Sequence, residues 1–345
     1  MKTKEGIQKL IFLILYTFFS LLNINGQTVL PEFKHYILEK VADGIYAAIH
    51  NNEGGYAICN AGIIDLGDKT IVIDPFISPT AARDLKQHAE ILTGKPVSLV
   101  LNLHTHNDHT RGNQVFVPDA DIIGTANARE YYLNNFQTEI NYEKETSPGK
   151  FLKIQEQFAI ASDEEKAELK MWQLYHQALI ESFPELKMTP PNITITDTLT
   201  IYGSKRKIVI ILTGVGHTTG DMVAWLPEEK IIFMSDQLFV KSHPYMGDGD
   251  PESWKNNLKR MIALNPEIAI PGHGPVGDVN SIYLMIDYIE TLTDMVNKEI
   301  QKGTDENKIM ELPMPDKYND WLISSFYKIN LKFLYHKLMV RTNPE

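Results

Sequence analysis

The sequence predicts an α/β fold of four layers, an αββα sandwich in which helices cover the outer faces of two β-sheets. Runs of β-branched residues separated by glycine-bearing turns fill residues 35–75 and recur in residues 192–236. Helical patterns follow the strands in both halves, and alternation of strands with helices is typical of α/β proteins. Because the two halves have a similar layout, we expect one sheet from each.

The first half can be followed element by element. Four strands are expected between residues 36 and 76, in the segments YILEKV, GIYAAIHN, YAICNAGIIDLG and KTIVIDPF. The helical pattern of residues 78–94 starts at Ser78, a favourable N-cap residue, and the apolar strand VSLVLNL follows at 97–103. Residues 120–125 then predict a further strand, and residues 126–135 predict a helix.

A polar, helix-rich segment, residues 141–190, interrupts this alternation and is expected to be an insertion or lid between the halves. Ser162 and Glu165 form a capping-box pattern inside it. After the second group of strands we expect a helix at 250–264, a strand at 267–274, and helices at 279–300 and 317–340. We place the main domain at residues 27–300 and a C-terminal helical extension, packed on it, at 301–345.

Residues 1–26 have the pattern of a secretory signal peptide. Lys2, Lys4 and Lys9 precede the apolar run LIFLILYTFFSLL, and cleavage is expected after Gly26. The run is shorter than the roughly 20 residues that span a bilayer, so an uncleaved anchor is the less favoured alternative. We therefore expect an exported protein, periplasmic or secreted, that is not stably inserted in a membrane once residues 1–26 are removed.

The composition excludes two classes of site. With 33 Lys and Arg against 44 Asp and Glu, the formal net charge of −11 is unsuited to a nucleic-acid backbone, which is bound through cationic side chains. Only one cysteine, Cys59, is present, so neither an intrachain disulfide nor a cysteine-based metal cluster can form. A small molecule is the expected partner, and no pattern assigns an oligomeric state.

The segment HTHNDHTRGN, residues 104–113, follows the apolar strand at 97–103. His104 and His106 are two residues apart at the strand end, so their side chains fall on one side, close enough to share a metal ion. Asp108 and His109 must lie on a turn, where they can serve a second metal. The alternative is a surface loop in which polar histidines simply gather.

Three more ligand-type residues recur near the carboxyl ends of apolar strands. They are His217 in IVIILTGVGHTTGD, Asp236 in KIIFMSDQLF and His273 in EIAIPGHGP. In α/β sheets, binding sites gather at that edge of the sheet. The four separate segments are therefore predicted to converge on one crevice, and their imidazoles and carboxylates suit zinc, iron or manganese.

This ordered set of residues, with its flanking glycines, resembles the metallo-β-lactamase-fold hydrolase superfamily over about residues 35–300. The resemblance implies a metallo-β-lactamase-like αββα sandwich with two metal ions, usually zinc, at one edge. It implies that His104, His106 and His217 hold the first metal. It implies that Asp108, His109 and His273 hold the second, and that Asp236 bridges the two. Two Zn²⁺ per chain are thus the expected cofactors, with Fe or Mn as alternatives.

Two divalent ions outweigh the charge of the carboxylates of Asp108 and Asp236, and such a site stabilises hydroxide near neutral pH. The expected function is that of an exported, dinuclear, zinc-dependent hydrolase, in which a metal-bridging hydroxide attacks the carbonyl of an ester, thioester, lactone or lactam. Asp108 is the expected catalytic residue, because its carboxylate can orient the nucleophile or move a proton.

Other residues are expected to support the site. Asp74 ends the strand KTIVID and, by the family pattern, hydrogen-bonds a ligand histidine; a plain strand-end turn is the alternative. Arg111 is expected to brace the motif loop. The loop after Asp236 supplies residues that can contact substrate, with solvated side chains as the alternative for each. These residues are Gln237, Lys241, His243 and Tyr245.

Three other functions remain open. The segment FMSDQLF resembles the bridging-aspartate segment of the glyoxalase II and lactonase type, whereas export favours a β-lactamase proper, which meets its substrates outside the cytoplasm. A di-iron oxidoreductase is less favoured, because that branch of the superfamily has a glutamate where His106 stands. A non-catalytic metal-binding scaffold is also less favoured, because degenerate members lose ligands and this sequence keeps them.

Overall fold

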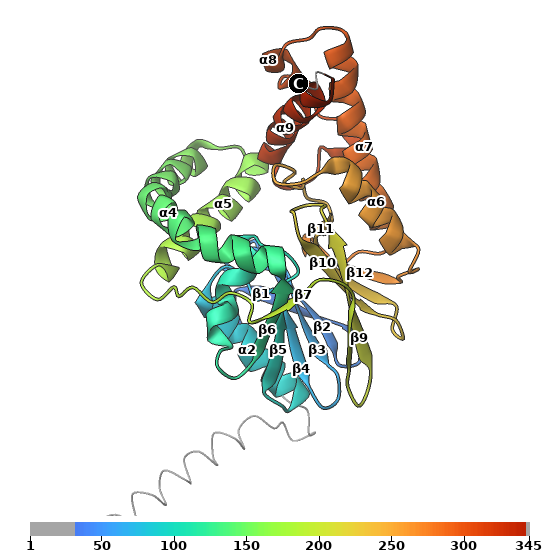
Figure 1. The fold of residues 1–345 in the computed structure, drawn as a ribbon. Coiled ribbons are helices and arrows are strands. Elements are labelled where there is room, and N and C mark those ends of the chain that lie inside the picture. The colour runs from blue at the N-terminus through green and yellow to red at the C-terminus, as the bar shows by residue number, and fades with distance from the viewer. Residues whose placement is uncertain (1–31, 343–345) are drawn as a thin grey trace, which may run out of the picture. The chain divides into compact units, whose positions relative to one another are not determined.

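The structure, a computed structural model, describes residues 32–342 of the chain. Two β-sheets with helices on their outer faces form the four layers expected from the sequence (Figure 1). The predicted signal peptide, residues 1–26, lies outside the described residues. Among the helices of residues 32–342, none combines the length and the apolar character needed to cross a bilayer.

The first sheet has the strand order β1-β2-β3-β4-β5-β6-β7. Strands β1 to β4 pair antiparallel, whereas β4 to β7 run parallel. The carboxyl ends of β4 and β5 meet at one edge, because Ile73 lies opposite Leu101. The strands are β1 (Tyr36–Ala42), β2 (Ile45–His50), β3 (Ala61–Asp65), β4 (Thr70–Ile73), β5 (Val97–Leu101), β6 (Asp121–Thr125) and β7 (Ile193–Ile195).

The second sheet has the order β12-β11-β10-β9-β8 and is antiparallel except between β11 and β12, where Phe239 lies opposite His273. Every residue of β10 and β11 is buried, which agrees with their nearly continuous apolar sequences, because both faces are covered. The strands are β8 (Leu199–Tyr202), β9 (Lys207–Gly214), β10 (Asp221–Leu226), β11 (Ile231–Phe239) and β12 (Ile268–His273).

Two apolar cores hold the layers together. The first lies between the sheets, where Ile64 and Ile73 of the first sheet join Ile210 and Phe233 of the second. The other covers the opposite face of the second sheet and includes residues of α6 (Pro251–Ile262), α7 (Val279–Gln301) and α9 (Ser325–Thr342). On the first sheet, α2 (Pro79–Thr93) starts at the predicted cap, since the Ser78 hydroxyl accepts a hydrogen bond from the Ala81 amide.

The insertion differs from its prediction. Helix α4 (Ala126–Ile160) begins at Ala126 and runs past Pro148 without ending near residue 135. Its buried residues Tyr132, Phe136 and Ile140 repeat every four positions and form one apolar cluster, so the helix continues where the sequence suggested a separate segment. Helix α5 (Asp163–Ser182) follows and has the predicted capping box of Ser162 and Glu165.

After α7 the chain forms α8 (Glu306–Ile309) and a 3₁₀ turn at Asp316–Tyr318 before α9. Helix α9 therefore begins eight residues later than the predicted 317, at Ser325, because residues 316–318 form this separate turn. Leu331 and Leu334 of α9 share a core with Ile289 of α7. Lys34 and the described residues after it belong to one compact unit, and a domain boundary at residue 300 stays a prediction.

Candidate metal centre

The motif segment lies directly after β5, and a short helix within it sets the direction of the Asp108 and His109 side chains. His106 has an extended backbone and is the N-cap of α3 (Asn107–Thr110), so Asp108 and His109 lie on a helical turn. A 3₁₀ helix (Arg111–Val115) follows at once. The turn that was predicted after His106 is therefore helical. His104 and His106 precede this helical turn, whereas Asp108 and His109 lie on it.

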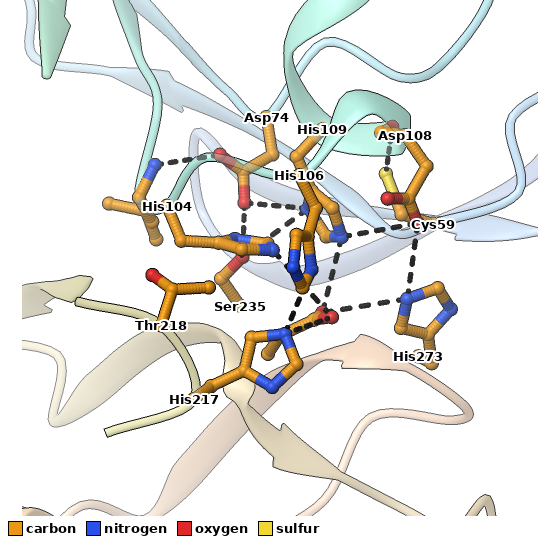
Figure 2. A network of polar contacts seen from close by, with 12 residues as sticks. Cys59, Asp74, His104, His106, Asp108, His109, His217, Thr218, Ser235 and His273 are labelled. Carbon is orange, nitrogen blue, oxygen red and sulfur yellow. Dashed lines mark hydrogen bonds and ion pairs between the residues drawn. The ribbon is translucent and has the colours of Figure 1, made fainter. Parts of the chain in front are cut away.

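Side chains of the second sheet reach the same place from three elements. His217 lies in the loop between β9 and β10, Asp236 lies within β11, and His273 ends β12. Figure 2 shows His217 and His273 pointing toward the histidines of the motif segment. The four segments that the sequence predicted to converge do lie together.

One carboxylate oxygen of Asp236 faces the first group of histidines. Its Oδ2 lies 3.3 Å from Nε2 of His217 and 3.7 Å from Nε2 of His104. The Nε2 atom of His217 lies 3.0 Å from Nδ1 of His106. Ligand atoms of these four residues all lie within 4.8 Å of one another, which is close enough to surround one ion.

The other oxygen of Asp236 faces the second group. Its Oδ1 lies 3.1 Å from Nε2 of His109 and 3.5 Å from Nε2 of His273. Asp108 completes this group, because its Oδ2 lies 3.3 Å from Nε2 of His273 and 3.5 Å from Nε2 of His109. The carboxylate of Asp236 thus lies between two groups of three ligand-type side chains.

These residues fit a metal centre, because buried polar atoms in the cluster lack hydrogen bonds. The Nε2 atoms of His104 and His109 and the Oδ1 atom of Asp236 are buried, and none makes a hydrogen bond within residues 32–342. A buried polar atom without a partner is costly, and a group of such atoms converging on one point needs an explanation. Divalent cations bound by imidazole and carboxylate would satisfy all three.

The electrostatics of the cluster favour bound positive charge. Burial alone would raise the pKa of Asp236, but the rings of His109, His273 and His104 hold it well below its usual range. Burial opposes protonation of His273, yet the carboxylates of Asp236 and Asp108 outweigh it and raise the pKa to about 9. Carboxylates that stay ionised in a buried site attract cations, whether protons or metal ions.

Asp74 orients His109. Its Oδ2 lies 3.0 Å from Nδ1 of His109, and its Oδ1 accepts a hydrogen bond of 2.9 Å from the Leu103 amide. A carboxylate beside Nδ1 holds a proton on that nitrogen and turns Nε2 toward Asp108 and Asp236. Of the two roles considered for Asp74, the geometry agrees with the hydrogen bond to a ligand-type histidine.

Ser235 does the same for His104, although no sequence pattern marks this residue. The Ser235 hydroxyl donates to Asp74 and lies 3.1 Å from Nδ1 of His104, so it is placed to accept the proton of that nitrogen. The backbone of Ser235 has φ of +48°, a left-handed conformation that is uncommon for serine. Both histidines therefore present Nε2 to the cluster.

Arg111 joins the motif loop to the insertion. Its guanidinium is buried and contacts both carboxylate oxygens of Glu143 on α4, at 2.8 and 2.7 Å. Glu143 also accepts a hydrogen bond of 2.8 Å from the side chain of Asn107. Helix α4 of the insertion is thereby joined to the segment that carries His106 and Asp108.

The sequence model of a protein family, the metallo-beta-lactamase superfamily, matches residues 54–273 of the chain. This range contains all of the ligand-type residues. The chain belongs to the metallo-beta-lactamase superfamily. Membership agrees with the fold and with the His/Asp cluster, and it suggests a metal-dependent hydrolase.

Individual curated relatives resemble the chain only in part. A metallo-beta-lactamase type 2 from Bacteroides fragilis is 28% identical over 131 residues, which are 36% of this chain and 50% of that protein. A linear primary-alkylsulfatase from Pseudomonas sp. (strain ATCC 19151) is 22% identical over 268 residues, 72% of this chain and 48% of that protein. The chain thus spans about half the length of these curated relatives.

Among solved structures, a metallo-beta-lactamase from Pontibacter korlensis aligns with a TM-score of 0.54 and 14% identity, and covers 74% of this chain and 99% of its own. This likeness is one of fold.

A cavity of about 280 Å³ opens onto the cluster at His106, Asp108, Asp236 and His273. Of the substrate-contact residues predicted after Asp236, one lines this cavity and the others do not. Tyr245 lines the cavity, with its ring centroid 6.1 Å from that of His106. Lys241 is exposed and does not line it.

Two of these predictions fail for a physical reason. Gln237 is buried in β11 and donates from its side-chain amide to the carboxylate of Asp221. His243 is fully buried among the rings of Tyr288, Trp321 and Tyr327, and its Nδ1 lies 2.9 Å from the Tyr288 hydroxyl. A position in a loop next to the cluster did not determine the direction of either side chain.

Two further residues near the cluster, Cys59 and Asp248, were not predicted as part of the site. The Cys59 thiol is buried and donates to the backbone oxygen of Asp108 at 2.9 Å. Its sulfur and the ligand atoms of Asp108 and His109 lie within 4.8 Å of one another. Asp248 lies 3.0 Å from Nε2 of His106. Trp172 of α5 lines the cavity, which its helical spacing alone did not distinguish from a core position.

Proposed function

We propose that the chain is an exported, dinuclear metal-dependent hydrolase that acts on the carbonyl of an ester, thioester, lactone or lactam. The observation that carries the proposal is the position of Asp236, whose Oδ2 faces His104 and His217 and whose Oδ1 faces His109 and His273. A single carboxylate shared in this way suits two ions better than one. Residues 1–26, with their signal-peptide pattern, support export.

Two zinc ions, or iron or manganese in their place, would supply an activated water and an electrophilic partner for the carbonyl oxygen. His104, His106 and His217 would hold one ion, Asp108, His109 and His273 the other, and Asp236 both. Asp74 and Ser235 contact the Nδ1 atoms of His109 and His104, so both rings turn Nε2 toward the position that a cation would take.

Asp108 is the residue placed to handle protons. Its side chain borders the cavity, and its Oδ2 lies between the Nε2 atoms of His109 and His273. Burial would raise the pKa of Asp108, but the His109 and His273 rings hold it well below its usual range, so the carboxylate is ionised at neutral pH. An ionised carboxylate at the cavity wall can orient a water molecule and accept its proton.

The second candidate function is that of a β-lactamase proper. The name of the Bacteroides fragilis relative favours it, although that protein shares only 28% identity over 131 residues. Lactam hydrolysis uses the same arrangement of residues around a different carbonyl. A cephalosporin therefore belongs in the first substrate panel.

Metal analysis and a substrate panel test the proposal together. We expect about two equivalents of zinc or another hydrolytic metal per chain. At least one chromogenic ester, thioester, lactone or cephalosporin should be turned over, and chelation should abolish that turnover. His106→Ala should lose metal and activity, while His336→Ala, at an exposed histidine of α9, should keep both. Absence of bound metal after zinc supplementation, or turnover that survives in His106→Ala, would refute the proposal.

A further inference from the structure

Aromatic rings from distant segments form part of the wall of the 280 Å³ cavity. Trp172 and Tyr175 come from α5, Phe326 from the first turn of α9, and Tyr245 from the loop after β11. The rings touch in series. The centroid of Tyr245 lies 5.4 Å from that of Phe326, and Phe326 lies 5.6 Å from Trp172.

Hydrogen bonds fix the orientation of this wall. The indole nitrogen of Trp172 donates to Glu168 at 3.2 Å, and Glu168 also accepts from the Ser324 hydroxyl at 2.7 Å and the Ser325 amide at 3.0 Å. The Tyr175 hydroxyl accepts a hydrogen bond of 3.3 Å from Asn107 in the motif segment. The rings are therefore held in place before any ligand arrives, which lowers the cost of binding.

The charged side chains on the cavity wall are all acidic, apart from the histidines of the cluster. Asp248 and Glu139 border the cavity beside Asp108 and Asp236, and no lysine or arginine is among the described residues that line it. Bound metal ions would be offset by the four carboxylates. A ligand with its own carboxylate therefore finds no cationic side chain here to replace its hydration.

A second cavity of about 660 Å³ adjoins this one, since both are lined by Ile58, Met171, His273 and Ile323. Its charges are mixed rather than cationic. Lys166 is paired with Asp163 at 2.8 Å, and Lys170 shares the wall with Glu53 and Glu168. If a substrate carbonyl lay near His273, one side of the molecule could occupy the smaller cavity and the other side this larger one.

We infer that the site accepts uncharged carbonyl compounds with an aromatic group, and that this group binds against Trp172 and Phe326. The reaction in this inference rests on the proposed function, whereas the class of ligand is inferred from the cavity lining and its charges. Aromatic rings gain both apolar burial and ring contacts in such a wall. Anionic substrates, including β-lactams with their carboxylate, are disfavoured by Asp248 and Glu139.

Three ethyl esters of matched design test the ligand class by hydrolysis: ethyl acetate, ethyl phenylacetate and ethyl 4-carboxyphenylacetate. We expect kcat/KM for ethyl phenylacetate to exceed that of each of the others by about tenfold or more. Trp172→Ala should lower kcat/KM for ethyl phenylacetate by about tenfold and leave ethyl acetate within about twofold. Tyr142→Ala, an exposed aromatic of α4 outside the cavity lining, is the matched control.

Binding of 1-phenylpentan-2-one, the ketone analogue of ethyl phenylacetate, separates the ligand class from the chemistry. Calorimetry on the purified protein should show binding that weakens about tenfold in Trp172→Ala and in the 4-carboxy analogue of the ketone. If the ketone binds in this pattern but no ester, thioester, lactone or cephalosporin is hydrolysed, the proposed function falls and the inference stands. If Trp172→Ala binds the ketone as the unmodified chain does, or the carboxylated compounds bind or react best, the inference is overturned.

Discussion

The carboxylate of Asp248 lies 3.0 Å from Nε2 of His106, and the same ring turns its Nδ1 toward His217, 3.0 Å from Nε2 of that residue. His106 is thus the one histidine of the first group whose Nδ1, rather than Nε2, faces the cluster. Its hydrogen bond with Asp248 is the leading cause of the low pKa of Asp248. Asp248 therefore positions His106 as Asp74 positions His109.

For Asp248→Ala we expect affinity for the first metal ion to fall about 10- to 100-fold, because the His106 ring loses the partner that fixes its orientation. Competition against a chromophoric chelator measures the change, with no need for substrate. Asp119→Ala removes a carboxylate of similar type from the surface, where it pairs with Lys86, and should leave affinity unchanged. Equal affinity in Asp248→Ala would show that His106 needs no such support.

Asp74→Asn should weaken both folding and metal binding. Asp74 is buried and accepts from the Leu103 amide, from the Ser235 hydroxyl and at Nδ1 of His109. An amide cannot accept at both of its ends, so a donor loses its partner at a cost of about 1–3 kcal/mol. Urea denaturation of the metal-free protein gives the loss of stability. A midpoint equal to that of the unmodified chain would contradict the role assigned to Asp74.

His243 makes part of the stability dependent on pH. Burial lowers its pKa to about 4, whereas the unfolded chain has a value near 6.5. The folded state therefore binds fewer protons in this window, so stability is complete above about pH 6.5 and falls as the pH drops toward about 4. Between pH 7.5 and 5.0 this contribution is about 2 kcal/mol.

In His243→Asn we expect that part of the acid-induced loss to vanish, whatever the change in stability at pH 7.5. Urea denaturation at both pH values measures it as the difference between the two free energies of unfolding. His336→Asn, at an exposed site, is the control. The prediction is wrong if His243→Asn loses as much stability on acidification as the unmodified chain.

Glu168→Ala should loosen the contact between the insertion and α9. It removes the acceptor for the Ser324 hydroxyl and the Ser325 amide, and a carboxylate at the start of a helix contributes about 1–2 kcal/mol. We expect faster hydrogen exchange and faster proteolysis at residues 319–326. Glu156→Ala on the exposed side of α4 should show neither effect. Unchanged exchange rates would show that Ser324 and Ser325 are held by other contacts.

Much of the fold follows from local patterns. The four strands of residues 36–76, the cap at Ser78 and the capping box of Ser162 and Glu165 all lie where residue type and spacing predict them. The extent of α4 was not predictable in the same way. Its apolar stripe of Tyr132, Phe136 and Ile140 is short, and its contacts with Leu186 bring together residues far apart in the chain.

The ligand-type histidines were predictable because they lie at strand ends or shortly after them, whereas Asp236, which was predicted at the end of its strand, lies within β11. The direction of Gln237 and His243 was not predictable, since it depends on partners such as Asp221 and Tyr288 in other elements. Asp248 and Ser235 were missed for the same reason. Neither has a spacing that marks it, and each is recognised only by the histidine that the fold places against it.

The rings that face the cavity from α5 and α9 contribute none of the imidazole or carboxylate groups in the cluster. Substitutions at Trp172 or Phe326 therefore leave the ligand-type side chains around Asp236 unchanged. The cavity rings and the ligand-type side chains are encoded in separate parts of the gene, so either set can vary without a change in the other.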